Sequence, residues 1–321
     1  MHVIDHSLKD LQIFKSFLST IKNVVSIIIC DISEPTYDVL EQKRNEINRK
    51  SIDVFIAIGG GSAIDMAKGL SVLATNTKPA IFYRGFDKFE EPIIPIIAMP
   101  TTAGTGSEIT PNASFIDTND KRKMGINGEA IRPKYAILDP ELTVTCPKGP
   151  TISAGIDSLV HSTEAFVAKD SNIMAKMFAK KGFTLVYDNL SPLVKDLNNI
   201  NLREKVMFGA FLSAIALMNS GTGPAAAMSY PLGVHFGVPH GIGGGIFLPH
   251  VVKHNLDQNC NDYNGLYDGA NLKPKKFLDQ IWDLWNRLSI PQDLNEFGMS
   301  SDNIKSFVSD TMDLKGALDQ N

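Results

Sequence analysis

The spacing of hydrophobic and polar positions changes at about the midpoint of the chain. Before it, short β-branched runs alternate with amphipathic stretches, and buried strands are predicted at 24–30 and 54–58 with a helix over 37–49 between them. A third apolar run at 93–98 contains Pro95, which cannot donate to a sheet, so an irregular or edge strand is predicted there. This alternation is typical of βαβ units with a parallel sheet.

After residues 146–153 (CPKGPTIS), nearly every segment has helical spacing. Helices are predicted at 153–169, 172–197, 201–219, 222–236, 240–255, 274–289 and 300–314. The fourth and fifth are rich in glycine, which usually marks close helix packing or the approach of the backbone to a ligand. The length allows two hydrophobic cores, so we predict an α/β domain over 1–149 and an all-helical domain over 150–321.

Composition and charge exclude several classes of partner. The chain has 321 residues, a formal net charge of -4 and a pI near 6.0, and it has no basic patch of the kind that binds nucleic acid. The first residues lack an apolar signal core, and no stretch approaches the roughly 18 apolar residues that span a bilayer. Cys30, Cys146 and Cys260 form no CxxC pair, which fits a reducing cytoplasm.

The strongest local motif is IAIGGGSAIDMAK at 56–68, where a predicted strand runs through three glycines into a helix. Backbone amides at such a helix start suit a pyrophosphate. The candidate residues of this cradle are Gly59, Gly60, Gly61 and Ser62. A tight turn with Ser62 as helix N-cap explains the glycines equally well. Asp65 and Lys68, inside the following helix, would touch the cofactor or face water.

A second motif, MPTTAGTGSEIT at 99–110, is rich in hydroxyls and glycines. Short hydroxyl donors that could bind phosphate, ribose or a nicotinamide amide are Thr101, Thr102, Thr105 and Ser107. Taken alone, this segment favours an ordinary turn.

Two segments carry candidate metal ligands. Asp157 and His161 lie four residues apart in AGIDSLVHSTEAFVA, on one face of a predicted helix, where a carboxylate and an imidazole suit Fe(II) or Zn(II). Such a pair is more often an exposed ion pair, so a further ligand is needed. Residues 231–255 hold four of the seven histidines, and His240 at a predicted helix start is the best presented. Weaker candidates are His235, His250 and His254.

Taken in order, these segments resemble the iron-containing (group III) alcohol dehydrogenase family. The resemblance covers both glycine motifs, YAILDPELT at 135–143, AGIDSLVHSTEAF, and PLGVHFGVPHG followed by LPHVVKHN. It implies a Rossmann-like parallel-sheet domain that binds NAD or NADP, then a helical domain, with a divalent metal in the cleft between them. Dehydroquinate synthase shares this architecture.

The resemblance also implies roles for single residues. Gly60, Gly61 and Ser62 would bind the cofactor pyrophosphate, and Asp5 would meet the adenosine ribose, which favours NAD over NADP. The nicotinamide side would contact Thr101, Thr102 and Ser107, and the metal ligands would be Asp157, His161 and His240.

The sequence departs from the family at one ligand position. Where similar enzymes have an AxHxMAHPLG-like run, this chain has PAAAMSYPLG, which puts Ala226 at a ligand position and Tyr230 at the second histidine. Three ligands still allow a catalytic ion with an open position; alternatively His235 substitutes, or metal binding is lost. Both termini are expected to be shorter than the family's, so the chain would be a fragment or have a misplaced start.

The function expected is hydride transfer between NAD(H) and a small alcohol or aldehyde. The metal would stabilise the substrate oxygen as a Lewis acid, and Tyr230 would relay the proton or simply pack as an aromatic. The alternatives are a metal- and NAD-dependent lyase similar to dehydroquinate synthase, which would need a basic cluster, and a non-catalytic paralogue. Neither nucleic acid nor a membrane is expected as a partner, and a homodimer or higher homo-oligomer is compatible with the resemblance.

Overall fold

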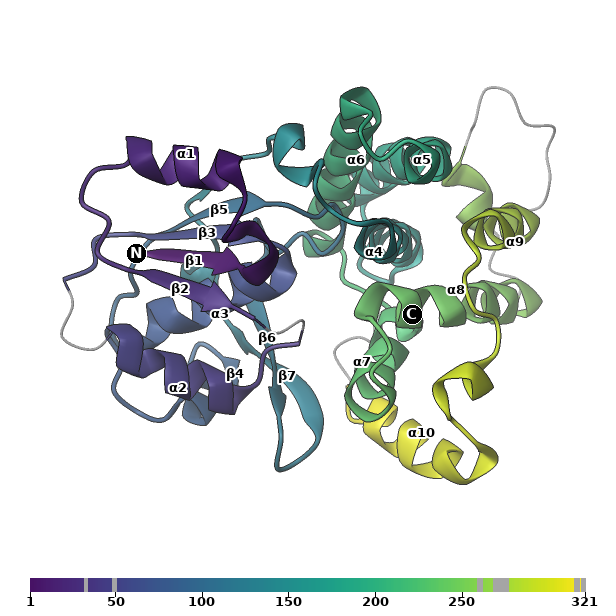
Figure 1. Cartoon of the computed structure of the whole chain (residues 1–321). Coiled ribbons are helices and arrows are strands. Elements are labelled where there is room, and N and C mark those ends of the chain that lie inside the picture. The colour runs from purple at the N-terminus through teal and green to yellow at the C-terminus, as the bar shows by residue number, and fades with distance from the viewer. Residues whose placement is uncertain (32–33, 48–50, 259–261, 268–276, 315–317, 319–321) are drawn as a thin grey trace. The chain divides into compact units, whose positions relative to one another are not determined.

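The structure is a computed structural model of the chain, and it describes residues 1–31, 34–47, 51–258, 262–267, 277–314 and 318 (Figure 1). The chain divides into two compact units. The first comprises Met1–Thr101 and Ser107–Leu142, and the second comprises Thr102–Gly106 and Thr143–Asn321. The boundary predicted between residues 149 and 150 falls in the first turn of helix α4 (Lys148–Val167).

The first unit contains a five-stranded parallel sheet in the order β2-β1-β3-β5-β8. Its strands are β1 (His2–Asp5), β2 (Ile27–Cys30), β3 (Phe55–Gly59), β5 (Ile96–Pro100) and β8 (Tyr135–Ala136). Its helices are α1 (Gln12–Thr20), α2 (Tyr37–Ile47) and α3 (Gly61–Leu73). Figure 1 shows α1 on one side of the sheet and α2 and α3 on the other. The predicted βαβ architecture is therefore confirmed.

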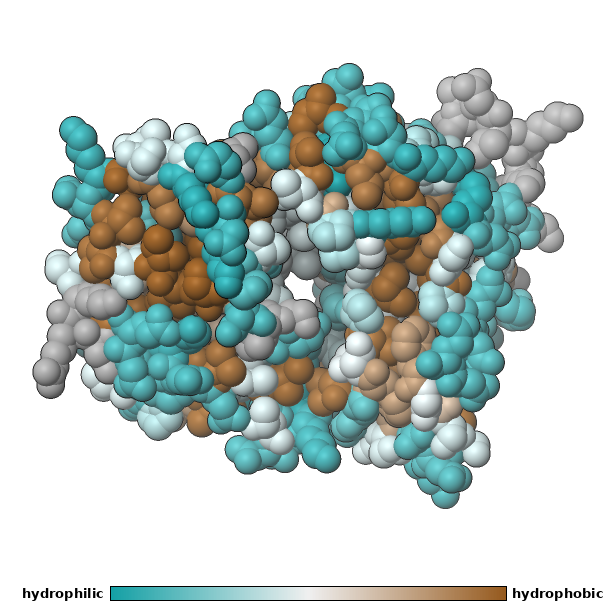
Figure 2. Space-filling model, viewed as in Figure 1, coloured by the Kyte–Doolittle hydropathy of each residue, from teal (hydrophilic) through white to brown (hydrophobic). Residues whose placement is uncertain are grey.

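Both faces of this sheet are covered by hydrophobic side chains. Val3 and Ala57 belong to one buried cluster, whereas their strand neighbours Ile4 and Ile58 belong to another. Successive strand residues point to opposite faces, which is why continuous apolar runs rather than alternating ones mark these strands. Hydrophobic side chains also reach the surface beside α1 (Figure 2), and Ile27 on the edge strand β2 is 37% exposed.

The expectation for the apolar run around Pro95 was wrong. Strand β5 is an interior strand, paired with β3 on one side and β8 on the other. Pro95 immediately precedes the strand, where its carbonyl accepts a hydrogen bond from the Phe55 amide at 2.9 Å. A proline before the first strand residue removes no ladder donor, so it does not confine the strand to an edge.

A second sheet was not predicted. Strands β6 (Asn112–Asp117) and β7 (Arg122–Asn127) form an antiparallel hairpin, and β4 (Gly85–Phe86) pairs with β7. A signal was present in the sequence, because Asn112-Ala113-Ser114-Phe115 alternates polar and apolar residues and the polar turn Thr118-Asn119-Asp120-Lys121 follows. In the structure, Lys121 has φ +51° in this turn.

The second unit is helical, as predicted. After α4 come α5 (Ile173–Lys195), α6 (Ile200–Met218), α7 (Pro224–Phe236), α8 (His240–Asp257), α9 (Phe277–Leu288) and α10 (Ile304–Met312). Helix α4 packs against α5, α6 and α8 and is buried along most of its length, with Ile156 and Leu159 fully inside the core. None of the described helices has the length and apolar character needed to cross a membrane.

The glycines of α8 let it lie directly on α4. A Cβ on Gly241 would come within 2.0 Å of the Ser153 carbonyl oxygen, and one on Gly245 within 2.5 Å of Ile156 Cγ2. No side chain fits at these two positions. Of the two interpretations that the glycine run allowed, close helix packing is the one observed here.

Candidate active site

The predicted metal ligands Asp157, His161 and His240 lie together in the second unit. Asp157 and His161 are one turn apart on α4, and His240 is the first residue of α8. Asp157 Oδ1 is 3.4 Å from His161 Nε2 and 3.8 Å from His240 Nε2, and one ligand atom from each residue lies within 4.8 Å of the others. Across the residues described, this is the group of three that could hold a metal ion.

The geometry and the chemistry of these side chains fit a divalent ion. An ion bonded at about 2.1 Å in a tetrahedral arrangement separates its ligand atoms by about 3.4 Å. The separation of Asp157 from His161 equals that value and the separation of Asp157 from His240 is 0.4 Å longer; both exceed an ordinary hydrogen bond. A carboxylate with two imidazoles suits Fe(II) or Zn(II), and an open position remains for substrate.

Close helix packing brings these ligands together. Gly241 directly follows His240, and a Cβ on it would also lie 2.9 Å from the Asp157 Cβ. The imidazole at the start of α8 is therefore held one residue away from the backbone contact with α4. The sequence proposes all three residues as ligands, and the glycine contact is what places His240 beside Asp157.

Two residues of α7 contact the ring of His240. Ser229 Oγ lies 2.6 Å from His240 Nδ1, and the Tyr230 ring stands edge-on to the imidazole with ring centroids 4.9 Å apart. Tyr230 thus lies beside a candidate ligand, as its predicted role requires. Ala226 is buried and its side chain has no ligand atom.

The histidines proposed as weaker ligands lie elsewhere. His235 Nε2 is 2.8 Å from Asp310 Oδ2, so the hypothesis that His235 replaces the missing ligand finds no support among the described residues. His250 stands edge-on to Trp282.

Glu164 was missed by the sequence reasoning. Its buried carboxylate accepts hydrogen bonds from the Thr222 hydroxyl at 2.9 Å and from the amides of Gly223 and Ala225 at 2.8 and 2.6 Å. Gly223 is the N-cap of α7 and offers no side chain, so Glu164 caps α7 from α4. Burial raises the pKa of this carboxyl group, and the hydrogen bonds oppose the rise. Its position three residues after His161 was the available signal.

In the first unit, the strand order shows at which edge of the sheet a nucleotide is expected to bind. From β1 the chain continues to β2 on one side, whereas β3 and β5 lie on the other side, so the strand order reverses between β1 and β3. In open parallel sheets, ligands bind at such a switch point, beyond the carboxyl ends of the strands. Asp5 ends β1 and Gly59 ends β3, and a Cβ on Gly59 would lie 2.8 Å from Asp5 Cβ. The Thr101 amide donates to the Gly59 carbonyl at 2.9 Å.

The glycine motif opens α3 at this edge. Gly60 is the N-cap, no side chain caps the helix, and Gly61 and Ser62 are its first residues. The alternative in which Ser62 is the N-cap was therefore wrong. Asp5 Oδ1 accepts from the amide and hydroxyl of Ser7 at 2.9 and 2.6 Å.

The remaining predicted cofactor residues differ in their surroundings. Asp65 accepts from the Ser107 hydroxyl at 2.5 Å and from the Ser114 amide at 2.8 Å. Lys68 is fully buried and donates to Ser107 Oγ at 3.0 Å and to the Asn112 carbonyl at 2.8 Å, so of its two alternatives the one in which it faces water was wrong. Burial lowers the pKa of Lys68 to about 8, and the nearby Asp65 opposes this.

Thr102 and Thr105 belong to the segment that groups with the second unit. Within that unit, Gly104 lies against α4, where a Cβ would come within 2.3 Å of the Ala154 carbonyl oxygen. The predicted contact of Thr102 and Thr105 with a cofactor stays a prediction.

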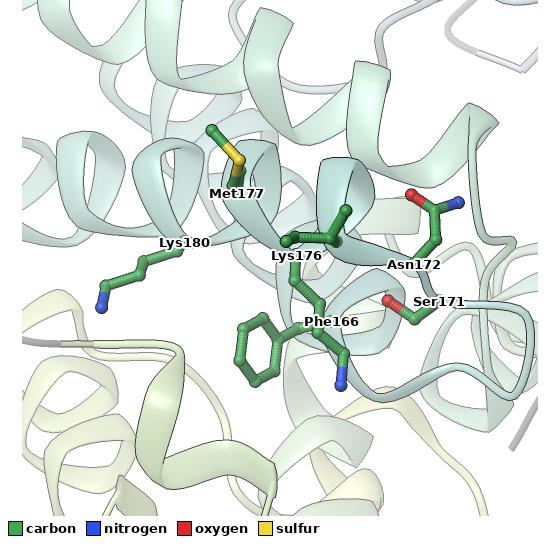
Figure 3. A pocket seen from close by; sticks show the side chains of 7 residues that line it. Phe166, Ser171, Asn172, Lys176, Met177 and Lys180 are labelled. Carbon is green, nitrogen blue, oxygen red and sulfur yellow. The ribbon is translucent and has the colours of Figure 1, made fainter.

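A surface cavity of about 400 Å³ lies over the start of α5 (Figure 3). Its lining residues are Phe166, Ser171, Asn172, Ile173, Lys176, Met177 and Lys180. None of the predicted site residues lines it, so it does not contribute to the candidate active site.

The similarity to known proteins extends over most of the chain. Residues 1–140 match the profile described as "Iron-containing alcohol dehydrogenase", and residues 151–320 match "Fe-containing alcohol dehydrogenase family, C-terminal". The chain is 30% identical over 304 residues to the 1,3-propanediol dehydrogenase of Citrobacter freundii, which covers 91% of this chain and 79% of that protein. It is 36% identical over 208 residues to the NAD-dependent methanol dehydrogenase of Bacillus methanolicus, and that match spans 65% of this chain but only 55% of the relative.

A solved structure extends the similarity to the whole fold. The sulfoacetaldehyde reductase of Bifidobacterium kashiwanohense in complex with NAD+ has a TM-score of 0.91 and 26% identity, covering 100% of this chain and 85% of that one. These relatives are named dehydrogenases and reductases, which favours the oxidoreductase interpretation over the lyase. The chain therefore belongs to the iron-containing alcohol dehydrogenase family.

Proposed function

We propose that this chain is an NAD-dependent alcohol dehydrogenase or aldehyde reductase that uses a divalent metal, iron by its family, at Asp157, His161 and His240. The observation that carries the proposal is the convergence of one carboxylate and two imidazoles within 4.8 Å. The substrate class is a small alcohol or its aldehyde, in line with relatives named for methanol and 1,3-propanediol. A homo-oligomer in the cytoplasm remains part of the proposal.

The metal, when bound, supplies Lewis acidity toward the substrate oxygen. Asp157 and His161 are only 4% and 6% exposed, so they hold their ligand atoms away from competing water. Tyr230 is the candidate for moving the alcohol proton, since its ring lies against His240. On the nucleotide side, the Asp5 carboxylate would accept from a ribose hydroxyl and repel a 2′-phosphate, which favours NAD over NADP.

The test is a His240→Ala variant. Removing one of three ligands should abolish metal retention and lower hydride transfer by at least about 100-fold, while NAD+ affinity stays within about twofold. Metal content, NADH oxidation with a panel of small aldehydes and NAD+ binding by calorimetry are the measurements. His250→Ala serves as the control, because His250 lies outside the cluster.

Two results would contradict this function. Unchanged turnover in His240→Ala would reject the metal assignment. Wild-type protein that retains metal and NAD+ but oxidises no NADH with any aldehyde would instead support the non-catalytic paralogue.

A further inference from the structure

The hydroxyl of Ser229 lies between the backbone of α7 and the ring of His240. Its oxygen is 2.6 Å from His240 Nδ1 and 2.6 Å from the Ala226 carbonyl oxygen. Ser229 is 1% exposed, so both contacts are made out of reach of bulk water. Because buried polar groups are hydrogen-bonded, each of these two contacts needs a proton, which Ser229 or His240 has to supply.

Counting those protons gives each hydrogen bond a direction. The Ala226 carbonyl can only accept, so the single hydroxyl proton of Ser229 is donated to it. The oxygen of Ser229 then accepts, and the proton between it and His240 is carried by Nδ1. A neutral imidazole has one N–H, so Nε2 keeps its lone pair, and Nε2 is the atom that lies 3.8 Å from Asp157.

We propose that Ser229 is a positioning residue for the metal centre: it selects the Nδ1-protonated form of His240 and directs the Nε2 lone pair at the ion. The inference rests on the proposed function, because it presumes that His240 binds a metal. A metal-bound histidine is generally oriented through its other ring nitrogen. Here a serine and the carbonyl of Ala226 provide that orientation.

The local packing keeps Ser229 in place. Gly243 follows His240 by three residues on α8, and a Cβ on it would lie 3.2 Å from Ser229 Cβ, so the two helices touch at this point. His161 differs, because its Nδ1 is buried without a hydrogen-bond partner among the residues described. Of the two imidazoles, His240 is thus the one whose Nδ1 has a described hydrogen-bond partner. Since Ala226 supplies no ligand, the site depends strongly on that orientation.

The experiment compares Ser229→Ala with Ser162→Ala. Ser162 is also fully buried in a helix. Its hydroxyl donates to carbonyls of its own helix, to Ser158 O at 3.0 Å and Leu159 O at 3.2 Å, and has no described contact with a ligand nitrogen. Affinity for Fe²⁺ is measured anaerobically by competition with a chelator. Ser229→Ala should bind Fe²⁺ about 10- to 100-fold more weakly, Ser162→Ala should match the wild type, and Ser229→Thr should recover most of the loss. Affinity of Ser229→Ala within twofold of the control would overturn the proposal.

A second measurement needs no metal and separates this inference from the proposed function. In metal-free protein with ¹⁵N-labelled histidine, long-range ¹H–¹⁵N spectra report which ring nitrogen is protonated. His240 should be protonated at Nδ1 in the wild type and should shift toward the Nε2-protonated form in Ser229→Ala. The Nε2-protonated form in the wild type would reject the role of Ser229. Wild-type protein with the expected tautomer but no affinity for Fe²⁺ would reject the metal function instead.

Discussion

Lys68 is a buried cation that joins α3 to the segment after β5. Its ammonium group donates to Ser107 and Asn112, and Asp65 lies 3.8 Å from it. Removing one member of such a pair leaves the other buried without compensation, which costs more than the pair contributes. We therefore expect Lys68 to contribute to stability.

Replacing Lys68 with Met should lower the free energy of unfolding by about 3 kcal/mol at pH 7, measured by urea denaturation. Lys78→Met is the control: Lys78 pairs with Glu90 at the surface, so its loss should cost less than about 1 kcal/mol. Equal effects of the two variants would argue against the buried network.

The lowered pKa of Lys68 also predicts how the free energy of unfolding depends on pH, and Lys68→Met is the reference variant. The pKa of Lys68 falls from 10.5 to about 8 on folding because the group is desolvated, so the unfolded chain binds this proton more tightly between those values. Wild-type stability should therefore rise relative to Lys68→Met as pH increases from 8 to 10.5, with a constant difference below pH 8. A difference that stays flat up to pH 10 would contradict the lowered pKa.

The sequence alone could propose some residues of the site and not others. Asp157 and His161 share a helix, so their spacing predicts a common face. The surroundings of Lys68 could not be predicted, because its partners Ser107 and Asn112 lie far along the chain and meet it only when β6 forms beside α3. Ser229 gave no signal, since its contact with His240 depends on how α7 lies on α8.

At the scale of elements, the packing of α8 on α4 connects the glycine run to the metal centre. Helical periodicity predicted both helices well, since hydrophobic spacing is a local property. It could not show which glycines face α4. Similarly, Pro95 was misread because its effect depends on whether it precedes a strand or lies within it.

A Gly241→Ala variant tests this contact. The added methyl would meet the Ser153 carbonyl, so α8 must shift, with a loss of about 2–3 kcal/mol of stability and a weaker hold on the ion. Gly149→Ala is the matched control: it lies in the first turn of α4 with nothing near its Cβ, and it should stabilise the protein by up to about 1 kcal/mol. Thermal unfolding and Fe²⁺ titration measure both effects. Normal Fe²⁺ affinity in Gly241→Ala would show that the contact does not position His240.

At the scale of the whole molecule, the two candidate sites belong to separate compact units. The metal ligands come from α4 and α8, whereas the glycine motif and Asp5 lie at one edge of the parallel sheet. A ligand that binds only the folded state stabilises the elements that hold it. The metal ion and the nucleotide should therefore each slow amide hydrogen exchange in the unit that binds it.

Hydrogen exchange measured by mass spectrometry checks this expectation. Fe²⁺ should slow amide exchange at least about tenfold in peptides from α4 and α8, and NAD+ should do so in peptides that span the end of β3 and the first turn of α3. Peptides from α9, which contributes none of the proposed ligands, are the internal control. NAD+ protection without any Fe²⁺ response in α8 would leave a nucleotide-binding protein with no metal centre.

The contact of Gly241 with Ser153 also bears on which ions the protein accepts. Asp157 and His240 project from two backbones that lie in contact at Gly241, so their spacing is constrained by helix packing as well as by side-chain rotation. Calcium prefers six to eight oxygen ligands at 2.3–2.6 Å, so a rigid trio with two nitrogens discriminates against it, whereas first-row transition ions with shorter bonds are accommodated. The glycine contact of α8 with α4 would thus contribute to the choice of metal before any chemistry begins.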